Sequence, residues 1–229
     1  MSKISFLRHD GWVGPSDLNQ TLNIIGCGAV GSHAAVLAVR MGFHNIRLWD
    51  DDTVESHNIA NQAFLSSQIG ELKTTALADL LKQINPDVRV ETINRFFSSE
   101  QDSGITGPII IAVDSMRARY DIYKVFKMNP MIPIVTEIRL GFDGGEIHII
   151  DPLNSDKCQA WYDTLRDDSE IPDGPCNLRI CTTLVQLTVS NAVHAVCNYF
   201  ASERHSYKHE FTPRTVILFK QKLKLLQLE

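Results

Sequence analysis

The chain has 229 residues, of which 44% are hydrophobic and 21% charged, and its formal net charge is -5. This length and apolar content suffice for one sizeable core, and a chain without a basic surplus is not expected to bind nucleic acid. The sequence has no run of 18 apolar residues and no charged-then-apolar leader, so we expect a cytoplasmic protein without a membrane span.

The first twenty residues, 1–20, contain two glycines and a proline and predict a short N-terminal arm. A short strand or an irregular arm segment is expected around Ile4–Leu7, followed by a loop. Arg8 is the arm's only arginine, and a solvated surface charge is its simplest interpretation. We expect the whole chain, residues 1–229, to form one domain that carries this arm.

Three glycines in GxGxxG spacing join an expected buried strand at Leu22–Ile25 to an expected helix at Ser32–Met41; they are Gly26, Gly28 and Gly31. The first glycine permits a tight turn, the second lets the main chain approach a phosphate, and the third lets the helix pack on the strand. The helix N-terminus adds unpaired N–H groups and partial positive charge. The pattern predicts a phosphate-binding loop, with a glycine-rich turn that binds no ligand as the alternative.

A second strand is expected at Ile46–Trp49, and the acidic run Asp50–Asp52 follows it. An acid about 20 residues beyond a glycine loop can accept hydrogen bonds from ribose hydroxyls. The polar stretch that comes next leaves the same carboxyl edge of the sheet, where open α/β sheets bind ligands. Three amide side chains there are candidate nucleotide contacts: Asn58, Asn61 and Gln62. Because asparagine also favours turns and caps, capping is the alternative role.

A helix is expected at Gly70–Ile84, with Lys73 in its first turn. A cation at that end opposes the helix dipole, so the position is locally unfavourable unless an anion is close. A solvated surface lysine is the alternative. Asp114 follows an apolar run at 108–113 that is typical of a central parallel strand. It therefore lies at the ligand edge, although a cap for the next helix is an equal interpretation.

The other predicted elements follow the same alternating pattern. A strand is expected at Val88–Ile93, and residues 151–175, rich in acids, proline and glycine, predict a mobile crossover loop. The remaining elements are a helix at 115–128, a strand at 132–137, a hairpin around Asp143–Gly144, a helix within 176–200 and a strand at 215–219. The fold class is α/β, a Rossmann-like and mainly parallel sheet flanked by helices, with antiparallel strands added in the C-terminal part.

Five ordered motifs make the chain resemble the ThiF/MoeB/HesA superfamily, the adenylating module shared with ubiquitin-activating enzymes. The motifs are GCGAVGS, LWDDDTVESHNIANQ, IGELKTTAL, INP and AVDSMRAR. They are similar in order and spacing to the family's glycine loop, its acidic D-x-D segment, its lysine helix and its aspartate after the fourth strand. The resemblance covers residues 20–150 well and residues 176–200 loosely.

The resemblance implies a single ATP-binding adenylation domain with Mg2+ as a cofactor. In it the three loop glycines shape a cradle for the phosphates, Asp50 holds the ribose and Asp52 organises the same corner. The segment that lines the ATP site would include Asn58, Asn61 and Gln62. In the family's pattern an arginine stands where this chain has Asn61.

The resemblance further implies that Lys73 contacts the phosphates and that Asp114 supports Mg2+ and the transferring α-phosphoryl group. The reaction would be ATP-dependent adenylation of the C-terminal carboxylate of a small ubiquitin-like or sulfur-carrier protein, or of a peptide ending in glycine. It would release pyrophosphate and be carried out by a homodimer. An arginine from the partner's N-terminal region is usual, and only Arg8 could serve. The alternatives are an NAD-dependent oxidoreductase and a non-catalytic nucleotide-binding subunit of a heterodimer.

The five cysteines show no paired CxxC spacing, which fits a reducing compartment and the absence of a structural zinc. In the family, cysteines of the crossover region sometimes accept the acyl group as a thioester. Cys176 is the candidate here, because a helix N-terminus would lower the pKa of its thiol. A partly buried structural cysteine is the equal alternative.

Overall fold

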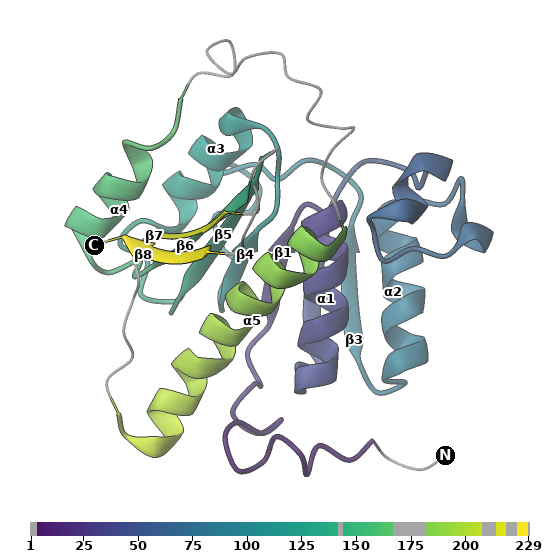
Figure 1. Ribbon diagram of the computed structural model, residues 1–229, viewed down its shortest axis with the longest axis horizontal. Coiled ribbons are helices and arrows are strands. Elements are labelled where there is room, and N and C mark those ends of the chain that lie inside the picture. Colours follow the sequence, from purple (N-terminus) through teal and green to yellow (C-terminus); the bar gives the residue numbers. More distant parts are fainter. Residues whose placement is uncertain (1–3, 142–143, 167–181, 208–213, 219–223, 229) are drawn as a thin grey trace.

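The computed structural model describes residues 4–141, 144–166, 182–207, 214–218 and 224–228 (Figure 1). Among these residues eight strands form one sheet in the order β3-β2-β1-β4-β5-β6-β7-β8. The strands are β1 Leu22–Ile25, β2 Asn45–Trp49, β3 Arg89–Ile93, β4 Ile109–Ile111, β5 Val135–Leu140, β6 Gly144–Ile150, β7 Arg214–Leu218 and β8 Lys224–Leu228. Strands β1 to β5 are parallel, and β6, β7 and β8 are added antiparallel.

The helices are α1 Ala29–Met41, α2 Lys73–Ile84, α3 Met116–Phe126, α4 Ser155–Tyr162 and α5 Thr182–His205, with short 3-10 turns η1 Ser56–Ala60 and η2 Ser66–Gln68. Side chains alternate across the buried strands, so successive residues of β1 face opposite layers. Ile24 packs with the layer of α1, α2 and α5, and Ile25 packs with the layer of α3 and α4. The two faces of the parallel sheet are therefore both covered, as apolar central strands require.

The order of the strands creates a switch point beside β1. The chain goes from β1 outward to β2 and β3, and then returns to the other side of β1 as β4. Ligands of open α/β sheets bind beyond the carboxyl ends of the strands at such a point. In Figure 1 this carboxyl edge faces the upper side of the molecule, where the segment that contains η1 and η2 lies.

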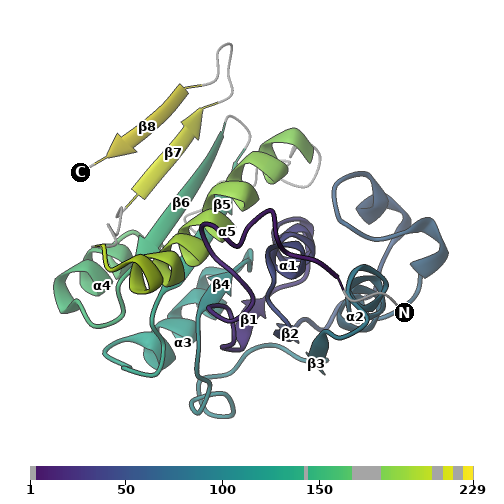
Figure 2. The same ribbon diagram turned by 90° about the horizontal axis from the view of Figure 1, so that it is seen from below.

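The C-terminal part extends the sheet with antiparallel strands. Helix α5 contacts β5 and β6 as well as α1, and Figure 2 shows β7 and β8 continuing the sheet beyond that helix. The expected hairpin is confirmed by the antiparallel pairing of β5 with β6, although Asp143 itself lies outside the described residues. The predicted fold class, a mainly parallel α/β sheet with antiparallel additions, is confirmed.

Two local predictions need correction. Ile4–Leu7 does not form a strand, because this exposed segment enters a turn, and 81% of Leu7 is exposed. Within the expected crossover loop, residues 155–162 form α4, which Asn154 caps by accepting the Lys157 N–H at 3.0 Å and which buries Trp161. Residues 167–175 of that loop lie outside the described part. Among the described helices, none has the length and apolar character needed to cross a membrane.

Candidate functional site

The glycine loop connects β1 to α1, and its three glycines differ in the space available for a side chain. Gly26 has φ 94°, and a Cβ there would lie 2.6 Å from the Ala112 carbonyl oxygen. A Cβ on Gly31 would lie 1.8 Å from the Gly26 carbonyl oxygen. A Cβ on Gly28 would meet nothing within 4 Å. The fold itself therefore requires Gly26 and Gly31, whereas the bare main chain at Gly28 faces open space that a ligand can fill.

The N-terminus of α1 opens onto that space. Gly28 is its N-cap residue and supplies no side-chain cap, and the first turn contains no acid. The first N–H groups of a helix lack intrahelical partners, and the helix dipole gives this end partial positive charge. Main-chain donors and an unfilled space beside Gly28 together suit a phosphate. We call this space beside Gly28 the phosphate space.

Asp50 stands at the carboxyl end of β2 and braces the glycine loop. One carboxylate oxygen accepts the Cys27 N–H at 2.6 Å, and the other accepts the Asp52 N–H at 2.9 Å. Burial raises the pKa of Asp50, and these two hydrogen bonds and the charge of Lys73 partly oppose that rise. The recorded contacts of Asp50 are thus to main chain, and its role toward a ribose remains a prediction.

Lys73 is the first residue of α2, and its side chain is only 9% exposed. Its ammonium lies 2.6 Å from a carboxylate oxygen of Asp52, whose side chain is 66% exposed. Main-chain pairing of residues 52–54 with residues 70–73 holds the two together, with the Lys73 N–H donating to the Asp52 carbonyl at 2.9 Å. The alternative of a solvated surface lysine is therefore wrong, because this ammonium is buried.

The ammonium of Lys73 belongs to the same corner as the glycine loop. Burial raises the pKa of the Cys27 thiol, and the charge of Lys73 acts on that thiol in the opposite direction. The same charge acts on the carboxyl of Asp50. A buried cation requires a partner, and here that partner is an acid standing largely in solvent.

Asp114 lies beyond β4, next to the glycine loop, since Gly26 approaches the Ala112 carbonyl. Asp114 is exposed. The cap of α3 is Ser115, whose hydroxyl accepts the Ala118 N–H at 3.3 Å, so the capping alternative for Asp114 is wrong. Its carboxylate is free to face a ligand at the carboxyl edge.

Of the three amide side chains, Asn58 caps the turn η1, and the oxygens of the other two lack a hydrogen-bond donor among the described residues. The buried Asn58 accepts the Glu55 N–H at 2.8 Å and donates its own N–H to the Glu55 carbonyl at 2.9 Å. Oδ1 of Asn61 and Oε1 of Gln62 are buried and accept no hydrogen bond from any residue that the structure describes. Buried acceptors of this kind call for a donor, and a ligand can supply it.

Sequence reasoning missed the residues that join this corner to α5. His33 of α1 contacts the Asn61 carbonyl through Nε2 at 3.2 Å and the Gln186 amide through Nδ1 at 2.8 Å. Thr182 donates to the Ala60 carbonyl at 2.7 Å. Burial lowers the pKa of His33, which favours the neutral ring. The two contacts with α5 join residues more than 120 positions apart, and no local pattern signals them.

The three carboxylates of Asp50–Asp52 have oxygens within 4.8 Å of one another, a spacing that could hold a cation. However, Asp50 already accepts two main-chain N–H groups and Asp52 already pairs with Lys73. Asp114 is exposed and follows the end of β4 that meets Gly26, so it is the better candidate ligand for Mg2+, which prefers carboxylate oxygens and phosphates.

Three cysteines lie inside the described residues, and all of them are free and buried: Cys27, Cys158 and Cys197. Cys176 and Cys181 lie outside the described part. The thioester hypothesis for Cys176 and the expectation of no structural zinc therefore stay predictions.

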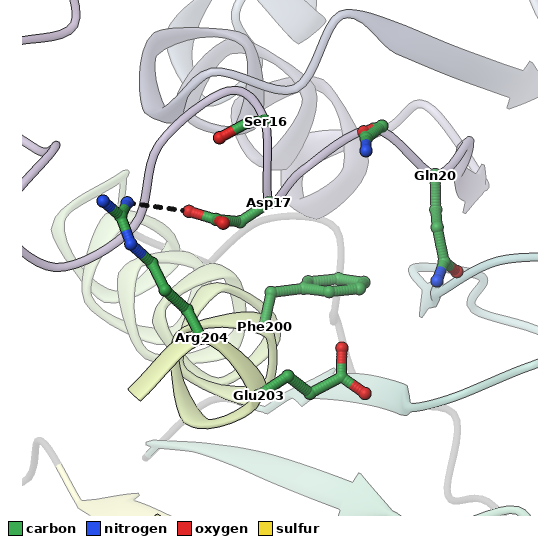
Figure 3. Close-up of a pocket in the computed structure, with 7 residues that line it drawn as sticks. Ser16, Asp17, Gln20, Phe200, Glu203 and Arg204 are labelled. Atoms are coloured by element: carbon green, nitrogen blue, oxygen red, sulfur yellow. Dashed lines mark hydrogen bonds and ion pairs between the residues drawn. The ribbon is translucent and has the colours of Figure 1, made fainter. Parts of the chain in front are cut away.

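A hollow of about 410 Å3 lies at the other end of the sheet, between the N-terminal arm and the end of α5 (Figure 3). Asp17 and Arg204, which form a 3.0 Å ion pair, line the hollow together with Phe200. The hollow borders residues that precede β1, whereas the glycine loop follows β1. It is thus separate from the carboxyl-edge corner, where the chemistry-bearing residues gather.

A model of the ThiF family matches residues 18–222 of the chain. The ubiquitin-like modifier-activating enzyme 5 of Drosophila virilis is 28% identical over 205 residues, covering 79% of this chain and 51% of that protein. The sulfur carrier protein ThiS adenylyltransferase of Escherichia coli (strain K12) is 27% identical over 164 residues, covering 69% of this chain and 63% of that protein. The chain thus spans about half to two thirds of the length of these curated relatives.

Among solved structures, the crystal structure of Escherichia coli MccB with ATP has a TM-score of 0.72 against this chain at 15% sequence identity. The match covers 94% of this chain and 65% of that one. At this identity the likeness establishes the fold alone.

Proposed function

Because the chain belongs to the ThiF family, we propose that it is an ATP-dependent adenylyltransferase acting on the C-terminal carboxylate of a small ubiquitin-like or sulfur-carrier protein, or of a peptide. The family is shown by a match over most of the chain. The activity, the acyl partner and the assembly are the proposal, since the chain spans only part of its relatives' length.

One observation carries the proposal: a buried lysine ammonium is paired with an exposed acid beside an open phosphate space. Lys73 is 9% exposed and Asp52 is 66% exposed, and the space borders Gly28. A ligand phosphate can replace the carboxylate of Asp52 without leaving that acid buried and unpaired, because water solvates it. A dinucleotide-dependent oxidoreductase gives this lysine no role.

The proposed reaction needs charge neutralisation more than a base. The carboxylate oxygen of the acyl partner attacks the α-phosphorus of ATP, forming a P–O bond. The bond from that phosphorus to the bridging oxygen breaks, and its electron pair leaves with pyrophosphate. The attacking carboxylate is already ionised, so no proton has to be removed. The task of the protein is to offset repulsion between anions and to stabilise charge that develops at phosphorus.

Particular residues of the chain supply these contributions. Lys73 acts as a point charge on the phosphates, and the free N–H groups at the start of α1 donate to phosphate oxygens. Asp50 holds the loop in shape through the Cys27 N–H, and Asn61 and Gln62 offer acceptors to the nucleotide. Mg2+, when held with Asp114, would offset the charge of the triphosphate.

We propose a homodimer, because Arg8 cannot serve its own chain. The arm packs at the ends of α1 and α5 that lie away from the site: Pro15 lies against Gly42, and His205 contacts the Trp12 carbonyl through Nε2 at 2.9 Å. Helix α5 has 24 residues and so spans about 36 Å. The exposed Arg8 could reach a phosphate only in a second copy. Mixing Arg8→Ala protein with Lys73→Ala protein should then restore part of the activity that each lacks.

The direct test is exchange of labelled pyrophosphate into ATP, with a candidate carrier protein or its C-terminal peptide present. A matched control is the same peptide with its terminal carboxylate converted to an amide. We expect exchange with the acid and none with the amide. Mg-ATP should also release heat in a calorimetric titration of the protein alone. No heat and no exchange with any carrier would overturn the proposal.

A second candidate is a non-catalytic nucleotide-binding subunit of a heterodimer. Asn61 favours it, because this position carries a neutral amide where the family pattern has a cation. This candidate predicts binding of Mg-ATP without exchange, and exchange that appears only when a second, different subunit is added. The same two measurements therefore separate it from the leading proposal.

A further inference from the structure

Helix α3 contributes an arginine that is buried directly behind the candidate Mg2+ residue. Arg119 is 4% exposed, and its guanidinium lies under the turn that connects β4 to α3. One terminal nitrogen donates to the Val113 carbonyl at 2.6 Å, and the other donates to the Asp114 carbonyl at 2.9 Å. One rigid planar group thus binds two consecutive carbonyls, which fixes the orientation of both peptide planes.

A buried carboxylate holds this guanidinium in place. Nε of Arg119 donates to Oε1 of Glu137 on β5 at 2.5 Å, and Glu137 is fully buried. The same oxygen accepts Nε of Arg139 at 2.8 Å, and Oε2 accepts the Trp161 indole N–H at 2.5 Å. Burial alone would raise the pKa of Glu137, but the hydrogen bond from Arg139 and the charge of Arg119 bring its pKa below the usual value.

The arrangement decides where the acid of Asp114 points. An arginine next to an aspartate would ordinarily pair with its carboxylate. Here Glu137 has taken the pairing position, and the two terminal nitrogens of Arg119 donate to the main chain of residues 113–114, one of them also contacting Sδ of Met116 at 3.5 Å. The side chain of Asp114 is left exposed at the carboxyl edge.

We propose that Arg119 is a positioning residue that presents the Asp114 carboxylate to the Mg2+ of bound Mg-ATP. The inference rests on the proposed function insofar as it needs Mg-ATP to bind at this corner. Arg139 offers a matched control, because it shares the same Glu137 oxygen but its other donors bind Thr164, away from the β4–α3 turn.

The test compares Arg119→Lys with Arg139→Lys, since both keep a cation for Glu137. ATP binding is titrated with Mg2+ and, separately, with EDTA. Arg119→Lys should lower the Mg2+-dependent affinity by about 10- to 100-fold, the usual effect of losing a residue that orients a metal ligand. It should leave affinity in EDTA unchanged, and Arg139→Lys should change neither. An equal loss in both variants would mean a merely structural role and would overturn the inference.

A double-variant cycle tests whether the effect passes through Asp114. Asp114→Asn should lower the Mg2+-dependent affinity by itself, and adding Arg119→Lys should lower it no further. Additive losses would overturn the inference.

A third measurement needs no nucleotide. Amide hydrogen exchange across residues 112–116 should be faster in Arg119→Lys than in Arg139→Lys, and equal rates would contradict the inference. If the wild-type protein bound no Mg-ATP, the proposed function would fail, and this exchange measurement would still decide the role of Arg119 in holding the turn.

Discussion

Two ion pairs flank the carboxyl edge of the sheet, and they differ in what surrounds the acid. The pair of Lys73 and Asp52 has a nearly buried cation and an acid that is 66% exposed. The pair of Arg119 and Glu137 has both members buried, with Glu137 fully so. The first can exchange its acid for an anionic ligand, because the released carboxylate stays solvated. The second cannot open without leaving a buried charge unpaired.

We expect the pair of Lys73 and Asp52 to take part in ligand binding and the pair of Arg119 and Glu137 to support the fold. An exposed acid contributes little to stability, because water competes with the cation and screens the attraction. A buried acid bound by two guanidinium groups is costly to lose, since the cations remain buried. We therefore expect the same chemical pairing to serve ligand exchange at α2 and rigidity at α3, with the burial of the acid determining which.

The largest effect should follow from neutralising the buried acid. Glu137→Gln keeps the shape of the side chain but leaves Arg119 and Arg139 without a charged partner. We expect the free energy of unfolding to fall by about 3 kcal/mol or more, measured by denaturant titration. A loss as small as that of Asp52→Asn would contradict the contrast drawn between the two pairs.

The dependence of protein stability on pH should reveal the buried pair of Arg119 and Glu137. The pKa of Glu137 is lower in the folded protein than in the unfolded chain, so its stabilisation is complete above the unfolded value of about 4.3. That stabilisation is lost as the pH falls through the lower, folded pKa. Wild-type stability should therefore drop on acidification more steeply than that of Glu137→Gln, as thermal melts across pH 3–6 would show.

Removing the buried ammonium should abolish most of the chemistry. Lys73→Ala should reduce pyrophosphate exchange by about 100- to 1000-fold, the usual cost of deleting one preorganised group that stabilises transition-state charge. Lys82→Ala is the control, because Lys82 is exposed on the same helix. Equal rates for the two variants would remove Lys73 from the mechanism.

Filling the phosphate space should weaken binding without harming the fold. Gly28→Ala adds a methyl group where no protein atom lies within 4 Å, so the melting temperature should change little. We expect ATP affinity to fall by about tenfold, since a close approach of main chain to phosphate is lost. Gly104→Ala is matched, because its Cβ would also meet open space, but Gly104 precedes β4 at the far edge. Undiminished affinity would place the phosphates elsewhere.

The smallest effect is expected from the exposed acid. Asp52→Asn should change the free energy of unfolding by less than about 1 kcal/mol, because its side chain is largely in solvent. Nucleotide affinity should not fall, since the ligand no longer competes with a carboxylate for Lys73. A loss of affinity would show instead that Asp52 itself serves the nucleotide.

The fold was predictable because its signals are local. The spacing of Gly26 and Gly31 indicates a tight strand-to-helix turn, which few other structures require. The apolar runs of β1 and β4 indicate buried parallel strands. The positions of Asp50, Lys73 and Asp114 at the carboxyl ends of their strands or loops follow from the same order. Their roles toward a nucleotide remain predictions.

The rest depends on contacts between distant segments. His33 meets Gln186 across 153 positions, and no pattern around either residue marks that contact. In the sequence, Glu137 is the last residue of a predicted strand. Its burial between two arginines depends on the packing of β5 beside α3 and α4, which no local pattern indicates. Ile4–Leu7 has strand-forming residues but no partner strand, so it forms none.

The burial of Cys27, Cys158 and Cys197 has a practical consequence for chemical labelling. Burial raises the pKa of all three thiols, that of Cys197 to about 12, so at neutral pH they are neither ionised nor accessible. Thiolate is the species that reacts with iodoacetamide or a maleimide. Rapid alkylation of the native protein, if it is observed, would therefore be assigned to the two other cysteines of the chain, Cys176 and Cys181.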